Sequence, residues 1–174
     1  MDQALTNVLT ENIVYEIAKA LSLPPTPRIR KVISSLTGGA LRGFAELASE
    51  LDGVVAEKGI AGAARWLLPR FLKAHSASGV ENIPPVGPLV VASNHPAYID
   101  SVVISAHITR QDFKVIIGEI PFFKHIPSIN KNAIFAPDPT DVMGRMQVIR
   151  EVIRHLKNNG AILIFPRGSI EADP

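Results

Sequence analysis

The 174-residue sequence predicts an α/β domain with a mostly parallel sheet and flanking helices, preceded by an N-terminal helical region. Two observations carry this prediction. From Gly79 onward, short apolar runs alternate with helical segments, which is typical of βαβ units. Before Gly79, long helical segments are separated by proline and glycine breakers. We therefore expect two regions, 1–78 and 79–174, joined at the small, polar stretch 76–79.

Three helices are expected in the N-terminal region. The first covers 3–21 and ends before the prolines at 24–27, because proline donates no amide hydrogen bond and restricts the residue before it. The second covers 28–51, where the glycine pair at 38–39 leaves a break open, and the third covers 54–75.

Four strands are expected in the second region. They are the apolar runs 88–93, 114–118, 133–136 and 161–165. The clearest helix between them begins at 138–141, where Asp138 can act as the N-cap, Pro139 fits the first turn and Asp141 favours the positive end of the helix. Its apolar stripe consists of Val142, Met143, Met146, Ile149, Val152, Ile153 and Leu156.

The composition excludes several classes of protein. Hydrophobic residues make up 47% of the chain, yet no apolar run approaches the ~18 residues of a membrane-spanning helix. The N-terminus shows no cationic, apolar leader of the secretory kind. The absence of cysteine excludes disulfides, thiol nucleophiles and cysteine-bound zinc, and fits a reducing cytoplasm. The net charge of +2 is too small to indicate a nucleic-acid partner.

The segment 58–73 combines apolar residues at helical spacing with charges of one sign. Its charged residues, Lys58, Arg65, Arg70 and Lys73, are all basic. This composition suits a helix in a lipid headgroup layer, although an ordinary amphipathic helix packed on its own domain shows the same pattern. We expect a cytoplasmic protein, peripheral at the inner face of the membrane, with the N-terminal region as a candidate docking element.

The stretch 93–100, Ser-Asn-His-Pro-Ala-Tyr-Ile-Asp, carries the strongest chemical signal. It places His95 where a predicted strand ends, and ligands bind at the carboxyl ends of strands in open α/β sheets. Asp100 follows on the next helix, where its carboxylate can turn back to the imidazole, fix its tautomer and stabilise the imidazolium. Spacing alone leaves another interpretation open, in which His95 is a turn residue and Asp100 pairs elsewhere on its helix.

No side-chain nucleophile accompanies this pair. The sequence has no Gly-x-Ser-x-Gly elbow and no cysteine, which favours a design in which His95 activates the hydroxyl of a substrate. A metal site built on His95 and Asp100 would need further ligands that the sequence does not offer. The other histidines are expected at the surface or in packing; they are His75, His107, His125 and His155.

The strand 161–165 runs into Pro166-Arg167-Gly168-Ser169, which presents a cation and backbone amides at the same edge of the sheet. Three blocks can therefore be compared with known families. They are 79–100, which ends in a His-x4-Asp motif, 118–135, and 165–169. Together they resemble the glycerolipid acyltransferases of the lysophosphatidic acid and glycerol-3-phosphate acyltransferase type (PlsC-type), over roughly half of the chain.

The resemblance implies acyl transfer from an acyl thioester, carried by coenzyme A or acyl carrier protein, to a lysophospholipid, glycerol phosphate or related alcohol. His95 would be the general base and Asp100 its partner. Because a thioester is already activated, this reaction needs no covalent enzyme intermediate, and no cofactor or metal is expected beyond the acyl donor. The alternative is a non-catalytic lipid- or acyl-carrier-binding module that retains the fold.

Two positions depart from the family pattern. The second block usually carries an arginine for the phosphate of the acceptor, where this sequence has Asp138. The third block usually reads Phe-Pro-Glu-Gly-Thr, and here Arg167 replaces the glutamate. Either Arg167 has taken over anion binding, with Arg145 or Lys131, or the acceptor is not a simple glycerol phosphate. The expected substrate-binding residues are Asn94, Pro96, Arg167, Gly168, Ser169, Lys131 and Arg145.

Family members continue past the third block with further strands, whereas this sequence ends at Pro174. The resemblance therefore predicts that the C-terminal part of the usual fold is missing and that the strand ending at Phe165 lacks its usual neighbours.

Overall fold

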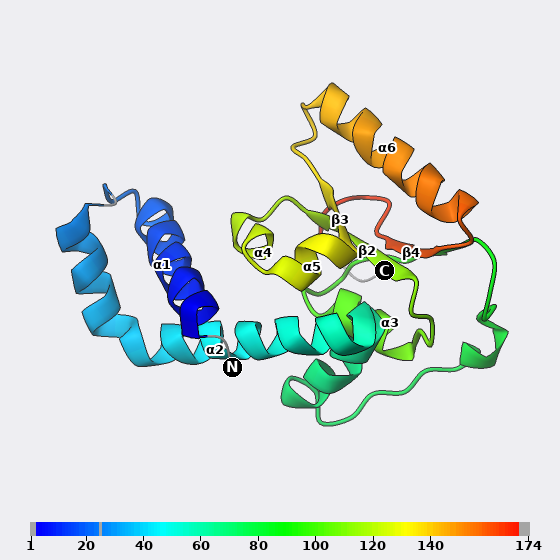
Figure 1. Cartoon of the computed structure of the whole chain (residues 1–174), viewed down its shortest axis with the longest axis horizontal. Helices are drawn as coiled ribbons and strands as arrows, with labels where there is room; N and C mark the ends of the chain where they lie inside the picture. Colours follow the sequence, from blue (N-terminus) through cyan, green and yellow to red (C-terminus); the bar gives the residue numbers. More distant parts are fainter. Residues whose placement is uncertain (1–2, 25, 171–174) are drawn as a thin grey trace.

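The computed structural model describes residues 3–24 and 26–170, and its α/β region is built on one parallel sheet (Figure 1). The strand order is β1-β4-β2-β3, and all three pairings are parallel. The strands are β1 (Leu89–Ala92), β2 (Phe113–Gly118), β3 (Ala133–Ala136) and β4 (Ala161–Ile164). All four predicted strands and the α/β class are confirmed.

The resemblance predicts that β4 lacks its usual neighbours, and in the structure β4 has a neighbouring strand on each side. β4 lies between β1 and β2, with Val91 and Val115 both in register with Leu163. The crossover from β3 returns the chain to the middle of the sheet instead of to its edge. The outer strands of this sheet are β1 and β3.

Helices cover the two faces of the sheet unequally (Figure 1). The end of α2 (Pro27–Leu67) and α3 (Asp100–His107) lie on one face. The buried core on that face comprises Ala61, Ile108, Phe113, Val115, Ala161 and Leu163. The opposite face carries α6 (Val142–Lys157), which contacts β3 and β4. Val90 of β1 points to that face and is 50% exposed, so α6 covers this face of the sheet only in part.

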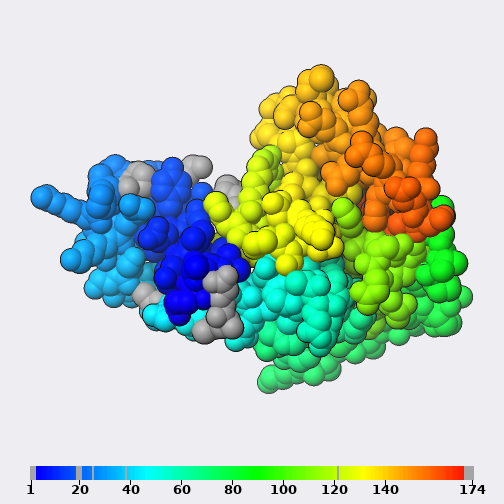
Figure 2. Space-filling view, viewed as in Figure 1, coloured from blue at the N-terminus to red at the C-terminus, as the bar shows by residue number. Residues whose placement is uncertain are grey.

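The N-terminal region is a helical hairpin of α1 (Gln3–Ala20) and the first part of α2. Thr26 caps α2 by accepting a 3.4 Å hydrogen bond from the Ile29 amide. Val14 and Ala18 of α1 are buried against Ile33 of α2. Figure 2 shows this hairpin projecting from one side of the α/β body. Pro25, part of the predicted proline stop, lies outside the described residues.

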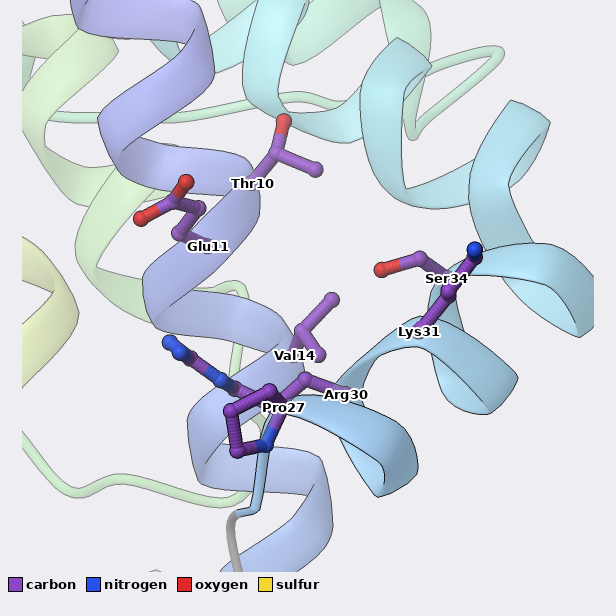
Figure 3. A pocket seen from close by; sticks show the side chains of 7 residues that line it. All are labelled: Thr10, Glu11, Val14, Pro27, Arg30, Lys31 and Ser34. Atoms are coloured by element: carbon purple, nitrogen blue, oxygen red, sulfur yellow. The ribbon is translucent and has the colours of Figure 1, made fainter.

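A shallow cavity of about 200 Å³ lies where α2 starts alongside α1 (Figure 3). It is lined by Thr10, Glu11, Val14, Pro27, Arg30, Lys31 and Ser34. All of these residues belong to the hairpin, so this cavity is remote in the fold from the sheet edge that carries His95.

α2 is one long element where two helices were predicted. It runs through 38–39 and 51–54 without a break, and its kink lies instead at Gly59, whose φ of +67° is non-helical. Single glycines such as Gly53 cost a helix only about 1 kcal/mol, which the packing of α2 against both halves of the molecule outweighs. α2 lies in the predicted N-terminal region, 1–78, but its side chains also pack in the hydrophobic cores that contain residues of the predicted region 79–174.

The basic segment 58–73 packs mainly inward. Ala61, Ala64 and Leu68 are buried, and Arg65 donates hydrogen bonds to the carbonyl oxygens of Ala106 and Ile108, at 3.3 and 2.8 Å, where α3 ends. The ordinary-packing interpretation of this segment is therefore the one that the structure supports. None of the helices between residues 3 and 170 is long and apolar enough to cross a membrane.

Short helical elements complete the chain. They are the 3₁₀ turns η1 (Leu68–Arg70) and η2 (Val80–Asn82), and the helices α4 (Pro121–Lys124) and α5 (Pro127–Asn132). Asp52 of α2 accepts a 2.6 Å hydrogen bond from the Ser128 amide at the start of α5. This bond ties α5, and through it the start of β3, to the long helix.

Candidate active site

His95 and Asp100 form the pair that their spacing predicted. The Nδ1 atom of His95 lies 3.0 Å from Oδ2 of Asp100, and the two side chains are only 19% and 18% exposed. The same carboxylate oxygen accepts a 2.7 Å hydrogen bond from the Ala97 amide. Asp100 therefore does not pair elsewhere on its helix. With Nδ1 protonated and donating to the carboxylate, the Nε2 atom carries the lone pair that a base requires.

Local structure explains why the pair forms. β1 ends at Ala92 and α3 begins at Asp100, so the loop between them has to reverse within seven residues. The Asp100 amide donates a 3.2 Å hydrogen bond to the Ala97 carbonyl, which closes the turn. Asp100 then occupies the first turn of α3, where the helix dipole favours a negative charge.

Phe165 forms one wall of the site. Its ring stacks on the imidazole of His95, with centroids 4.1 Å apart and planes inclined by 18°. The contact follows from the sheet, because β1 and β4 are neighbours and the Ser93 amide donates to the Ile164 carbonyl at 3.3 Å. Phe165 belongs to the third sequence block, 165–169, but a sequence pattern cannot show that its ring lies against His95.

The turn after β4 brings Arg167 to the edge of the sheet that carries His95. The Gly168 amide donates a 2.9 Å hydrogen bond to the Phe165 carbonyl, and Pro166 suits the second position of such a turn. Gly168 has a φ of +72°, a conformation that glycine tolerates best. Arg167 and Ser169 are exposed there. Asn94 and Pro96, beside His95, are exposed and half-buried respectively.

The two remaining predicted cations lie farther away. Arg145 is in the second turn of α6, at the same edge as His95 but beyond β3 at the far end of the strand order, and it donates a 3.3 Å hydrogen bond to the Pro139 carbonyl. Lys131 lies in α5, just before β3 begins, and therefore at the opposite edge of the parallel sheet. The structure thus groups Arg167, but not Lys131, with His95 and Asp100.

Asp138 is a turn residue and not the predicted N-cap of α6. It accepts hydrogen bonds from the amide and hydroxyl of Thr140, at 2.9 and 2.6 Å, which hold the pKa of its carboxyl below the usual value. The cap is Asp141, which accepts a 2.9 Å bond from the Gly144 amide. The capping rule placed the N-cap at Asp138, before Pro139. The rule could not show that the Asp138 carboxylate already accepts hydrogen bonds from Thr140.

An ion pair supports the opposite edge of the sheet. Arg110 is 5% exposed and binds Asp112, with 2.6 Å between Nη2 and Oδ2, and also donates to the Pro84 carbonyl. The hydrogen bond from Arg110 lowers the pKa of Asp112, and its partner raises the pKa of Arg110. No sequence pattern indicates this pair, since both residues lie in an ordinary polar loop before β2.

The other histidines lie away from the pair. His155 places Nε2 2.8 Å from the Asp112 carbonyl oxygen, which agrees with its predicted packing role. His75 and His107 contact each other edge to face, with ring centroids 5.1 Å apart. Within 3–24 and 26–170, no group of three or more potential metal-ligating side chains comes together.

Comparison with known proteins decides the family. The family model described as Acyltransferase matches residues 76–173, more than half of the chain. The chain belongs to the acyltransferase family. This is the PlsC-type glycerolipid acyltransferase family that the sequence resembles, and the match contains the His95–Asp100 pair, Phe165 and the Arg167 turn of this acyltransferase. Searches of curated proteins and of solved structures gave no match.

Proposed function

We propose that this acyltransferase moves a fatty acyl group from an acyl thioester, carried by coenzyme A or acyl carrier protein, to the hydroxyl of a lysophospholipid, glycerol phosphate or related alcohol. The observation that carries the proposal is the 3.0 Å contact between His95 Nδ1 and Asp100 Oδ2 at the carboxyl edge of the sheet. Its family membership supports the reaction class.

His95 acts as the general base in this proposal. Its Nε2 atom takes the proton of the acceptor hydroxyl as the oxygen attacks the thioester carbonyl, while Asp100 stabilises the resulting imidazolium. The C–S bond then breaks, and the imidazolium returns the proton to the leaving thiolate. The products are an ester and a free thiol, and His95 ends neutral. A positioned base of this kind typically supplies ~10²–10⁴ in rate.

Arg167 is the candidate anion-binding residue for an acceptor phosphate. It lies in the turn after Phe165, whose ring contacts His95, so a group bound there is close to the base. Asp138, which stands where the family usually has an arginine, carries a carboxyl whose pKa is lowered, so it is ionised at neutral pH and repels phosphate. An acceptor that is not a simple glycerol phosphate is the other hypothesis. We propose that the enzyme acts peripherally, at the cytoplasmic face of a membrane.

The test is an assay of the whole chain with labelled acyl-coenzyme A or acyl carrier protein and a panel of glycerol phosphate, lysophospholipids and simple alcohols. We expect transfer to one acceptor class, and a loss of about 10²–10⁴ in kcat for His95→Ala. His75→Ala is the matched control, because His75 is exposed and contacts His107 instead of the site. Transfer that survives His95→Ala would overturn the assigned base.

A binding measurement distinguishes the acyltransferase from the non-catalytic alternative. If the folded chain binds acyl carrier protein or lysophospholipid but transfers no acyl group with any acceptor, it is a binding module that retains the fold. Binding is measured by fluorescence polarisation of labelled ligand, independently of turnover.

A further inference from the structure

α6 presents a surface that the site does not use. Val148, Val152 and Leu156 are half-buried on the side that packs on the sheet, where His155 also reaches the Ala161 carbonyl. A second set of apolar side chains on the same helix is exposed instead. These side chains, which are between 42% and 68% exposed, are Val142, Met143, Met146, Ile149 and Ile153.

The exposed set forms a continuous row. Val142, Met146, Ile149 and Ile153 follow one another at intervals of four, three and four residues, which places them on one side of an α-helix. At 1.5 Å per residue the row is roughly 16 Å long. Met143 widens it in the first turn. In Figure 1, α6 lies along the outside of the α/β body with its long axis uncovered by any other helix drawn.

The charges beside the row have one sign. Arg150, Arg154 and Lys157 are exposed and, by helical spacing, share the outward half of α6 with the apolar row. The helix has one acidic residue, Glu151, which lies on the sheet side with its Oε1 3.7 Å from the Nζ atom of Lys114. The outward face of α6 therefore combines aliphatic and thioether side chains with cations, and the carboxylate of Glu151, which is 48% exposed, lies at its border beside Lys114.

We propose that α6 lies flat in the headgroup layer of an anionic membrane, with the row Val142–Ile153 inserted and the three cations on the lipid phosphates. A row of apolar side chains flanked by Lys and Arg is the pattern of interfacial helices. This helix replaces 58–73 as the docking element, because most apolar residues of 58–73 are buried or half-buried and Phe71 alone among them is largely exposed, at 56%.

The placement connects the membrane to the site. α6 begins after the carboxyl end of β3, the edge that also carries His95, so its first turn holds that edge close to the lipid. The part of this inference that places an acceptor beside His95 rests on the proposed function. Membrane binding itself is measured without catalysis.

The test is flotation of the whole chain with vesicles of phosphatidylcholine alone and with about one-third phosphatidylglycerol. We expect binding to the anionic vesicles, and partitioning roughly thirtyfold weaker for Arg150→Gln/Arg154→Gln, equivalent to about 1 kcal/mol for each arginine. Ile149→Ser/Ile153→Ser should weaken binding at least tenfold. Val86→Ser is the matched control, since Val86 is 78% exposed in the loop before β1 and should bind like wild type.

Two further measurements make the outcomes decisive. All variants should keep the wild-type melting temperature within about 2 °C, because the changed side chains are largely exposed. His95→Ala should bind vesicles like wild type, so failure of the proposed chemistry leaves this result intact. Unchanged vesicle binding in both double variants would overturn the proposal. A lower molecular mass of Ile149→Ser/Ile153→Ser in sedimentation, with vesicle binding unchanged, would assign the row to contact between copies of the chain.

Discussion

The ring of Phe165 lies against the imidazole of His95, with their centroids 4.1 Å apart and their planes 18° from parallel. The carboxylate of Asp100 is hydrogen-bonded to Nδ1 of the same imidazole. The orientation of the candidate base is thus fixed by two residues, one from the helix that follows β1 and one from the end of β4. Each of these contacts can be removed separately.

Phe165→Ala should lower kcat about tenfold and leave KM nearly unchanged. The substitution removes a ring contact worth about 0.5–1.5 kcal/mol, and this loosens the imidazole without touching the acceptor. Phe165→Tyr keeps the ring and should restore the wild-type rate. Steady-state kinetics of the two variants side by side is the measurement, and a wild-type kcat for Phe165→Ala would show that the stack does not position His95.

Asp100→Asn should reduce kcat by about 10²–10⁴ while the protein stays folded. An amide can keep the hydrogen bond from the Ala97 amide, but it cannot stabilise an imidazolium at Nδ1 as a carboxylate does. Kinetics and the melting temperature are measured on the same preparation. A loss of less than threefold would mean that Asp100 has a structural role only.

Arg167→Ala should raise KM for phosphorylated acceptors at least tenfold and leave unphosphorylated alcohols unaffected. A lost charge-assisted hydrogen bond is worth about 1.5–3 kcal/mol, and only a phosphate would make it. Arg28→Ala, an exposed arginine in the first turn of α2, is the control. Equal effects on both acceptor classes would exclude anion binding as the function of Arg167.

The Arg110–Asp112 pair predicts how stability depends on pH. Because the hydrogen bond from Arg110 lowers the pKa of Asp112 in the folded state, its stabilising contribution is complete above the unfolded value of ~3.9 and is lost as the pH falls through the folded value. Asp112→Asn should lower the unfolding free energy at pH 7 by about 1–3 kcal/mol, since buried Arg110 loses its charge partner. It should also flatten the acid dependence below pH 4.

Urea titrations at pH 7 and pH 3 measure both effects. Glu50→Gln, at an exposed position of α2, serves as the control. If Asp112→Asn lost as much stability as wild type between the two pH values, the pair would not be a source of the acid dependence.

Gly160→Ala should destabilise the fold by about 1–3 kcal/mol. A Cβ atom at Gly160 would lie 2.3 Å from Nε2 of His155, the atom that contacts the carbonyls of Asp112 and Ala161. Gly39→Ala is a sharp control, because a Cβ there meets nothing within 4 Å and alanine favours a helix by up to about 1 kcal/mol. In urea unfolding, Gly160→Ala should lower the free energy of unfolding and Gly39→Ala should raise it. If both substitutions changed it in the same direction, crowding at Gly160 would be contradicted.

The sequence was most informative where one local pattern determines the structure. Strands such as 133–136 are bounded by breakers, and His95 and Asp100 are five residues apart, so local geometry is enough to bring them together. It was least informative where distant segments compete. The kink at Gly59 instead of near 51–54 depends on what α2 packs against, and the Phe165–His95 stack depends on the order of the strands. The split of the α6 apolar residues into buried and exposed rows likewise requires the sheet to be in place.

The central place of β4 has a consequence for how the molecule is made. Within the described residues β1 pairs only with β4, although some seventy residues of chain separate them, so β1 joins this sheet only after residues 161–164 have left the ribosome. Such long-range pairing is slow, because a large loop must close before any contact forms. His95 is therefore synthesised before Phe165 and acquires its Phe165 wall only once β4 has joined β1, and the nascent chain is without an assembled site until that moment.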